Sequence, residues 1–464
     1  MPAKMPANNE NPIDTIVAPL TPPGVGGVGI LRLSGPNAES LLSRFFSPSR
    51  PTTRLSSYRL YHGRMIGTQG EIIDEVLAVV MRQPHSYTRE DVAEVHCHGG
   101  RQVMRRILDL FIDAGGRLAR PGEFTERAFL NGRIDLAQAE AVMDVIHAAS
   151  DRAREVAVGQ LEGKLSAVVY QIRAKVVELL AFVESHIDFP DEDIDFPSRS
   201  FLEQNAQKLM VQIDHLLSTF DSGRTLREGL SLLIIGKPNV GKSSLMNALL
   251  GEARAIVTST AGTTRDTIEE NLLLAGIPLR LIDSAGIRET SDPVESEGVL
   301  RAKKIAAFAD LILLVVDGSA PLDDDDLLAA DVCRGRKTLL VVNKADRPAL
   351  CSVDELSSLP QVSVSAQTGQ GFDALQEMVV ELCLPSVSND FSESILISDR
   401  RHRESLVRSL DYLKQFMEAF HQEASPEILA LELRGVLAAL GEITGETAPD
   451  EILETIFSRF CIGK

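Results

Sequence analysis

Eight residues near the middle of the chain, GKPNVGKS from Gly236 to Ser243, have the types and spacing of a phosphate-binding loop. They stand between the apolar run LSLLII and a helical pattern, the context in which G-x-x-x-x-G-K-[ST] holds phosphates. Gly241 lets backbone N–H groups close around the phosphates, Lys242 reaches the β/γ-phosphates, and Ser243 offers a hydroxyl to Mg²⁺. We therefore predict a nucleoside triphosphate site with Mg²⁺. The other contacts expected from this loop are Asn239, Val240 and Ser244.

Two later strand ends predict which nucleotide binds. The segment LRLIDSAG places Asp283 where it can hold the Mg²⁺ shell and Gly286 where a backbone N–H can approach the γ-phosphate. The segment LLVVNKAD ends a strand with Asn343, Lys344 and Asp346. A carboxylate at Asp346 can accept hydrogen bonds from the N1–H and the 2-amino group of guanine, which adenine cannot offer. The sequence therefore favours GTP over ATP.

Two loops complete the predicted nucleotide site. In VTSTAGTTRD, Thr263 and Thr264 are candidates for the mobile loop whose hydroxyl joins that of Ser243 on Mg²⁺ in the GTP state. The segment SVSAQTGQG is typical of a loop that supports the base. Small GTPases usually carry Lys or Arg where this chain has Gln367, so we expect a backbone contact there rather than side-chain stacking. The base-supporting contacts are Ser365, Ala366 and Gln367.

The hydrolytic step needs groups that the Ras pattern does not supply here. Ile287 follows D-x-x-G and has no polar group to orient the attacking water, as the glutamine of Ras does. Positive charge at the phosphates could come from Arg265, from Arg288, or from a monovalent cation on the side-chain oxygen of Asn239. The segment TSTAGT could surround that cation with oxygens of Thr258, Thr260 and Thr263. Carboxylates for the water are Glu289, Asp292, Glu295 and Glu297.

The composition indicates a globular chain of several domains. Its 464 residues predict about three domains, and 44% hydrophobic with 24% charged residues is typical of folded proteins. No apolar run approaches the ~18 residues of a membrane span, and the N-terminus lacks the apolar core of a signal peptide, so we expect a cytoplasmic protein. Five scattered cysteines favour neither disulfides nor a zinc site. The net charge of -19 restricts any nucleic-acid site to a local or shared patch.

Periodicity divides the chain into segments. Residues up to about 131 alternate short strand and helix patterns, and GVGGVG (24–29) leads into the strand-like ILRLSG, which disfavours a dinucleotide loop. Alternation on a strand would separate Cys97 from His96 and His98, which disfavours zinc. A helical pattern begins near residue 133, stops at the connector HIDFPDEDIDFP, and resumes after the nucleotide motifs. The terminal CIGK makes Cys461 the fourth residue from the end, and one interpretation is a thiol packed under Phe457 and Phe460.

The expected fold class is multidomain α/β plus all-α, with a Ras-like P-loop GTPase domain inserted into a helical domain. The expected segments are an N-terminal α/β domain at 1–131, the first helical part at 132–229, the GTPase domain at 230–386 and the second helical part at 387–464. Insertion requires the helices on either side of the GTPase domain to pack together, so the C-terminal tail would have a fixed place.

Several segments together carry a resemblance to a known family. They are TPPGVGGVGILRLSG near the start, RPGEFTERAFLNGRIDLAQAEAVMDVI before the helical region, the nucleotide motifs, and the terminal CIGK. In these the chain resembles, over nearly its whole length, the MnmE (TrmE) family of tRNA-modification GTPases. The resemblance implies a GTP-hydrolysing enzyme that adds an aminomethyl-type (carboxymethylaminomethyl) group to C5 of the wobble uridine of certain tRNAs. The implied cofactors are GTP, Mg²⁺, K⁺ and 5-formyl- or methylene-tetrahydrofolate as the carbon source.

The resemblance also implies partners and site residues. It implies a homodimer through the folate-binding N-terminal domain, a tRNA substrate, and a heterotetramer with an FAD-containing flavoprotein of the MnmG/GidA type. It makes Cys461 a candidate catalytic thiol and selects Glu295 for the water. It favours K⁺ over the arginines, with the ligands Asn239, Thr258, Thr260 and Thr263. The implied folate contacts are Arg32, Glu94, Arg133 and Lys464.

Two functions of other classes stay open on the nucleotide motifs alone. One is a regulatory GTPase that binds ribosomal RNA during ribosome assembly, and the other is a structural GTPase whose N-terminal domain only mediates dimerisation. The CIGK terminus and the folate-domain segments favour the enzyme over both.

Overall fold

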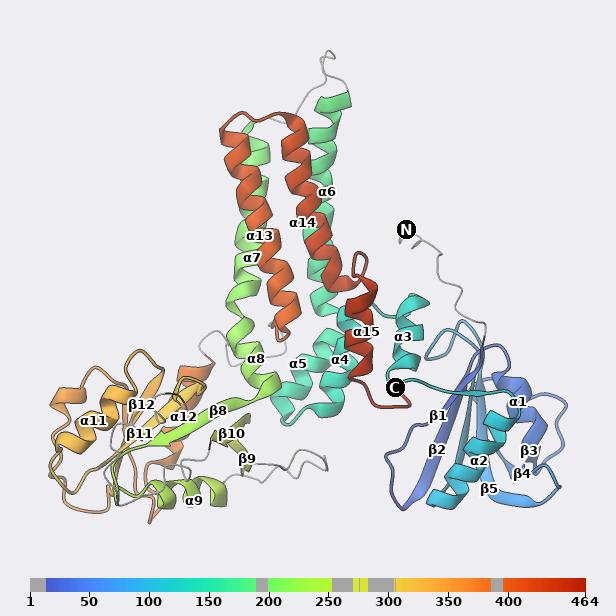
Figure 1. Cartoon of the computed structure of the whole chain (residues 1–464), viewed down its shortest axis with the longest axis horizontal. Coiled ribbons are helices and arrows are strands. Elements are labelled where there is room, and N and C mark those ends of the chain that lie inside the picture. Colours follow the sequence, from blue (N-terminus) through green and yellow to red (C-terminus); the bar gives the residue numbers. More distant parts are fainter. Residues whose placement is uncertain are drawn as a thin grey trace. The chain divides into compact units, whose positions relative to one another are not determined.

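The computed structural model describes residues 14–188, 199–252, 270–274, 276–282, 304, 306–384 and 395–464. They form two compact units, which we describe separately (Figure 1). The first unit contains Met1–Met143, Ser166–Arg173 and Leu437–Lys464, and the second contains Asp144–Leu165 and Ala174–Val436. The expected N-terminal domain therefore lies in the first unit and the expected GTPase domain in the second, whereas the expected helical residues are divided between them.

The first unit is built on a seven-stranded sheet in the order β3-β4-β5-β6-β2-β1-β7. Only β1 and β7 pair in parallel, so the expected mixture of strands and helices is confirmed, but this sheet is largely antiparallel. The strands are β1 (Ile16–Pro19), β2 (Gly26–Ser34), β3 (Phe46–Pro48), β4 (Tyr61–Ile66), β5 (Ile72–Met81), β6 (Val92–Gly99) and β7 (Arg117–Leu118). The accompanying helices are α1 (Ala38–Phe45), α2 (Arg101–Asp113) and α3 (Glu123–Leu130).

Two local predictions for this sheet are confirmed. Residues 24–29 lead from β1 into its antiparallel neighbour β2 instead of opening a helix, so they do not form a dinucleotide loop. Side chains on β6 alternate as predicted, with Cys97 buried while His96 and His98 are at least partly exposed. Burial raises the pKa of the Cys97 thiol to about 11, so this cysteine is a poor nucleophile. All five cysteines of the chain are free.

The carboxyl-terminal helix is anchored in the first unit. Helix α15 (Asp450–Ser458) contacts α3, as Figure 1 shows. Phe457 and Phe460 share an apolar core with Phe129 and with Leu136 of α4 (Leu136–His147). Such packing orders a chain end that would otherwise fray.

The second unit contains a six-stranded sheet in the order β13-β12-β11-β8-β10-β9, parallel except for β9 with β10. Strands β8 and β11 are buried along almost their whole length, as expected where helices cover both faces of a parallel sheet. The strands are β8 (Leu230–Ile235), β9 (Glu270–Leu274), β10 (Ile277–Ile282), β11 (Leu311–Asp317), β12 (Thr338–Asn343) and β13 (Gln361–Ser363). Parallel strands bring the loops after β8, β11 and β12 to one edge of the sheet.

Helices precede, accompany and follow this sheet in the chain. Helix α7 (Arg199–Ser218) packs along α13 (Arg400–His421), although the whole sheet separates them in sequence (Figure 1). The predicted helical character on both sides of the sheet is confirmed. The other helices are α5 (Asp151–Leu161), α6 (Lys164–Asp188), α8 (Phe220–Glu228), α9 (Lys242–Glu252), α11 (Asp324–Val332), α12 (Phe372–Cys383), α14 (Pro426–Thr444) and the 3₁₀ turn η2 (Asp354–Leu356). None of the described helices is long and apolar enough to cross a membrane.

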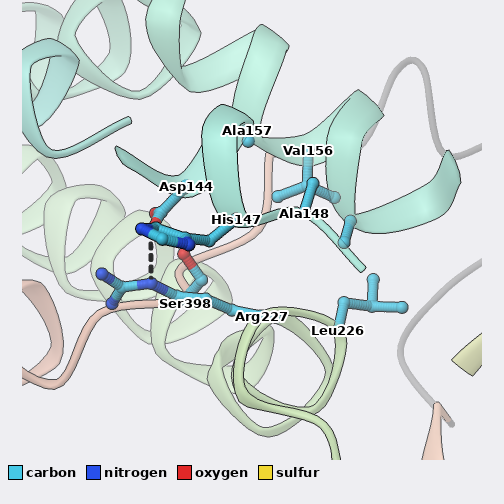
Figure 2. Close-up of a pocket in the computed structure, with 10 residues that line it drawn as sticks. Asp144, His147, Ala148, Val156, Ala157, Leu226, Arg227 and Ser398 are labelled. Carbon is cyan, nitrogen blue, oxygen red and sulfur yellow. Dashed lines mark hydrogen bonds and ion pairs between the residues drawn. The ribbon is translucent and has the colours of Figure 1, made fainter. Parts of the chain in front are cut away.

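A half-buried arginine joins three segments of the second unit next to a pocket. Arg227, near the end of α8, donates from Nε to Asp144 at 2.7 Å and from a terminal nitrogen to Asp399 at 2.5 Å. Figure 2 shows Arg227 and Asp144 in this pocket with His147 and Ser398. Burial alone would lower the pKa of Arg227, but attraction to the two carboxylates raises it. The guanidinium therefore offsets the negative charge of two aspartates just before the chain enters β8.

We expect Arg227→Met to destabilise the second unit by about 2–3 kcal/mol. The substitution removes the guanidinium that pairs with two partly buried carboxylates, and the loss stays below that of a fully buried pair because Arg227 is 28% exposed. Urea unfolding measures the effect. Arg434→Met is the matched control, since the side chain of Arg434 in its pair with Glu184 is 62% exposed and such a pair is worth at most about 1 kcal/mol. Equal losses in the two variants would contradict the prediction.

Candidate functional site

The phosphate-binding loop follows β8 and needs unusual backbone angles. Gly236 and Gly241 have φ of +157° and +99°, and Asn239 has φ of +65°, a region that asparagine enters more readily than most residues. A Cβ on Gly241 would lie 2.3 Å from Nδ2 of Asn343, so that position requires glycine. Val240 is buried and anchors the loop in the core beneath it.

Lys242, the first residue of α9, lies across the base of the loop. Its Nζ donates to the carbonyl oxygens of Gly236 at 2.8 Å and Lys237 at 2.7 Å. Ser243 and Ser244 are exposed in the first turn of α9. The loop therefore gathers an ammonium, two exposed hydroxyls and the N–H groups of a helix N-terminus at one point. This arrangement suits phosphate and allows Ser243 to hold Mg²⁺.

Asn343 connects the phosphate loop to the base-supporting loop. It is 2% exposed at the end of β12, its Nδ2 donates to the Val240 carbonyl at 2.8 Å, and its Oδ1 accepts from the Ala366 N–H at 3.0 Å. The amide thus fixes the spacing between two loops that are far apart in sequence. A nucleotide spanning phosphate and base positions depends on that spacing.

Lys344 stabilises the same loop from its other side. Its Nζ donates to the Asn239 carbonyl at 3.1 Å and to Asp317 at 2.5 Å. Burial alone would raise the pKa of Asp317, but hydrogen bonds from Lys344 and Ser319 lower it to about 2. Sequence reasoning did not single out Asp317, although its place at the end of the apolar run LILLVVD was the available signal.

The residues predicted to read the base, Asp346 and Ser365, lie in contact in the structure. Asp346 is exposed, and its Oδ1 accepts a hydrogen bond of 2.5 Å from the Ser365 hydroxyl. This bond is the main cause of a lowered pKa at Asp346, so the carboxylate stays ionised and can accept two donors from guanine. The Ala366 N–H is occupied by Asn343, and the Gln367 side chain is exposed.

Several predicted residues lie outside the described residues. They are Thr258, Thr260, Thr263, Thr264, Asp283, Gly286 and Glu295, together with Arg265, Ile287 and Arg288. The roles assigned to them in binding Mg²⁺ and K⁺ and in orienting water therefore stay predictions.

A second cluster lies in the first unit. Arg32 on β2 and Glu94 on β6 are cross-strand neighbours, and Arg32 donates to Glu94 from Nε at 2.8 Å. Burial alone would raise the pKa of Glu94, but a hydrogen bond with His96 and the charge of Arg32 lower it. The Tyr87 ring lies 5.0 Å from the Arg32 guanidinium and 4.7 Å from that of Arg133. The structure therefore brings together Arg32, Glu94 and Arg133, and adds Tyr87.

The C-terminal tail is bound beside this cluster. The Lys464 carbonyl accepts from the Phe124 N–H at 3.1 Å, and the Phe124 ring lies 5.8 Å from the Arg32 guanidinium. Gly463 has φ of +99°, and a Cβ there would lie 2.1 Å from the Pro19 carbonyl oxygen. The tail is therefore held against the end of β1 and the start of α3.

The thiol of Cys461 is exposed on this bound tail. Phe457 and Phe460 are 3% and 5% exposed, so these rings pack in the core without covering the Cys461 thiol. The interpretation of Cys461 as a thiol packed under these rings is wrong. A fixed and accessible thiol can serve chemistry, whereas a buried one would serve packing.

Comparisons with known proteins cover both units. A family model described as the GTP-binding protein TrmE N-terminus matches residues 15–133, and one described as the MnmE helical domain matches residues 136–461. Two relatives named tRNA modification GTPase MnmE, from Syntrophotalea carbinolica and Geobacter sulfurreducens, are 55% and 50% identical over 97% of this chain and 99% of each relative. A solved structure of the G domain of the T. maritima FeoB iron transporter matches 33% of this chain and 98% of its own at 26% identity, with a TM-score of 0.25, which is too low to support a structural argument.

The two matched families and the full-length relatives agree with the nucleotide site built from the residues. The loop of Gly236–Ser243, the hydrogen bonds of Asn343 and the exposed carboxylate of Asp346 match the parts that a GTPase requires. The chain therefore belongs to the MnmE family of tRNA modification GTPases.

Proposed function

We propose that this tRNA modification GTPase adds a carboxymethylaminomethyl-type group to C5 of the wobble uridine of certain tRNAs. The carbon comes from 5-formyl- or methylene-tetrahydrofolate bound in the first unit. Two copies of the chain associate through their N-terminal domains and work in the cytoplasm with an FAD-containing flavoprotein of the MnmG/GidA type, as a heterotetramer. The GTPase domain, inserted into the helical domain, hydrolyses GTP with Mg²⁺ and K⁺.

The observation that carries this proposal is the cluster beside the C-terminal tail. Arg32 pairs with Glu94 and lies over the Tyr87 ring. The Phe124 ring also lies near Arg32, and the Phe124 N–H donates to the Lys464 carbonyl. A regulatory or structural GTPase has no need for a charged, aromatic-lined cluster next to an exposed terminal thiol. An enzyme that presents a bound one-carbon donor to a nucleophile does need one.

The chemistry of the cluster suits a reduced folate. Glu94 is ionised and only 13% exposed, so it can accept hydrogen bonds from the N3–H and 2-amino group of a pterin ring in a site with little water. The Tyr87 ring offers an apolar face. Arg133 is exposed and lies against that ring, where its guanidinium can meet the carboxylates of the folate tail.

Binding of 5-formyl-tetrahydrofolate to the full chain, measured by titration calorimetry, tests the proposal. We expect Arg32→Ala to weaken binding by about 10–100-fold, because hydrogen bonds to charged groups are worth about 1.5–3 kcal/mol. Arg106→Ala is the matched control, since Arg106 pairs with Glu71 in an exposed bridge of the same unit. Absence of binding to the wild-type chain would favour a regulatory or a structural GTPase instead.

A further inference from the structure

The second residue of the phosphate loop, Lys237, is held by the start of helix α11. Its Nζ lies 2.7 Å from Oδ2 of Asp323 and 2.7 Å from Oδ2 of Asp326. These aspartates form the capping box of α11, in which each side chain accepts the backbone N–H of the other at 3.2 Å. The ammonium is therefore bound to two carboxylates that are themselves held by hydrogen bonds at the helix end.

Lys237 also contacts the lysine that is expected to bind phosphate. The Lys237 carbonyl accepts from Lys242 Nζ at 2.7 Å, so the residue that α11 holds by its side chain holds Lys242 by its backbone. The order of contacts runs from α11 to Lys237 and then to Lys242. A change in the position of Lys237 would move a carbonyl that accepts a hydrogen bond from the Lys242 ammonium.

The charges at this point make Lys237 difficult to replace. Asp326 is 2% exposed, and no described residue donates a hydrogen bond to its Oδ1. Hydrogen bonds from Lys237 to Asp323 and Asp326 raise the pKa of its ammonium. Without that ammonium, neither carboxylate would have an ion pair with another described residue, and their field would oppose a bound triphosphate.

We propose that Lys237 is a positioning residue for GTP, which acts through Lys242 and through the charge balance of the capping box of α11. Its side chain makes no contact with the nucleotide in this role. It fixes a carbonyl of the loop and cancels negative charge behind it. Both effects strengthen binding of the substrate and of the transition state alike, so they appear in KM more than in kcat.

Steady-state GTP hydrolysis by the full chain tests the proposal. We expect Lys237→Met to raise KM about 10-fold or more while kcat falls by less than threefold. Lys237→Arg, which keeps the charge, should restore KM to within about threefold of the wild type. A second substitution, Asp326→Asn in the Lys237→Met background, should recover at least threefold in KM because it removes one uncompensated charge. These changes in KM follow from the Coulomb energies of charges near a protein surface.

The matched control is Arg334→Met, which removes an exposed ion pair with Asp331 at the other end of α11 and should leave KM unchanged. Thermal unfolding of each variant separates positioning from folding. A lower unfolding temperature for Lys237→Met with unchanged KM would overturn the proposal and make Lys237 a structural residue. A Lys237→Arg variant as defective in KM as Lys237→Met would also overturn it, because charge would then not be the cause.

Discussion

Cys461→Ser is expected to abolish tRNA modification while GTP hydrolysis continues at the wild-type rate. The exposed thiol lies on a tail that binds next to Arg32, whereas the nucleotide site is built from another unit of the chain. A serine hydroxyl fills the same space but ionises far less readily, so it replaces the shape of cysteine and not its nucleophilicity. Nucleoside analysis of tRNA treated with the complete system, beside a phosphate-release assay, measures both activities.

Two variants show whether the thiol or the tail is responsible. Ile462→Ser changes the neighbouring residue, which is 51% exposed, and should modify tRNA normally. Gly463→Val should displace the tail, because its Cβ would overlap the Pro19 carbonyl at a backbone angle that valine avoids. Modification at the normal rate by Cys461→Ser would show that the thiol has no catalytic role.

The nucleotide site could be predicted from the sequence because each of its parts has a local cause. Gly241 and Asn239 adopt left-handed angles that few residues enter, and Asp346 follows a strand whose apolar run is unmistakable. Backbone angles and strand ends of this kind depend on the residue type at single positions and on short spacings in the sequence. Predictions of loop, strand and helix from those spacings are accordingly confirmed.

Contacts between distant segments could not be predicted in the same way. Asn343 hydrogen-bonds to both Val240 and Ala366. Arg227 pairs with Asp144 and Asp399, which lie 83 and 172 residues away from it in the sequence. No local pattern specifies such partners, because a buried amide or a half-buried guanidinium needs only some acceptor within reach. The antiparallel order of the first sheet was missed for a related reason, since alternating strand and helix patterns are compatible with several topologies.

Lys237 illustrates the same limit inside a motif. The pattern G-x-x-x-x-G-K-[ST] accepts any residue at its position, so nothing in the motif distinguishes Lys237. Its role becomes visible only when the capping box of α11 is placed against it. The motif thus predicts the atoms that meet phosphate, and the fold adds the charges that keep those atoms in position.

Replacement of K⁺ by Na⁺ is expected to slow GTP hydrolysis on the order of 100-fold. An arginine finger accelerates phosphoryl transfer by about 10³–10⁵ through its positive charge, and a bound cation supplies charge of the same sign. Asn239 is exposed, and its backbone is fixed by φ of +65° and by the bond from Lys344 to its carbonyl. Its side-chain oxygen can therefore be a preorganised ligand. A site sized for K⁺ by several oxygens would fit the smaller Na⁺ poorly.

The decisive variant for this prediction is Asn239→Gly, measured as phosphate release in each salt. Glycine keeps the left-handed backbone that alanine would strain by about 1 kcal/mol, so only the amide is lost. We expect Asn239→Gly to hydrolyse GTP slowly and equally in K⁺ and Na⁺ with nucleotide binding retained, and Glu295→Ala to lose hydrolysis in both. Equal wild-type rates in the two salts would contradict the cation and leave Arg265 or Arg288 as the source of charge. The comparison separates these sources because an arginine carries its charge in any salt, whereas a ligated cation must first fit the oxygens that hold it.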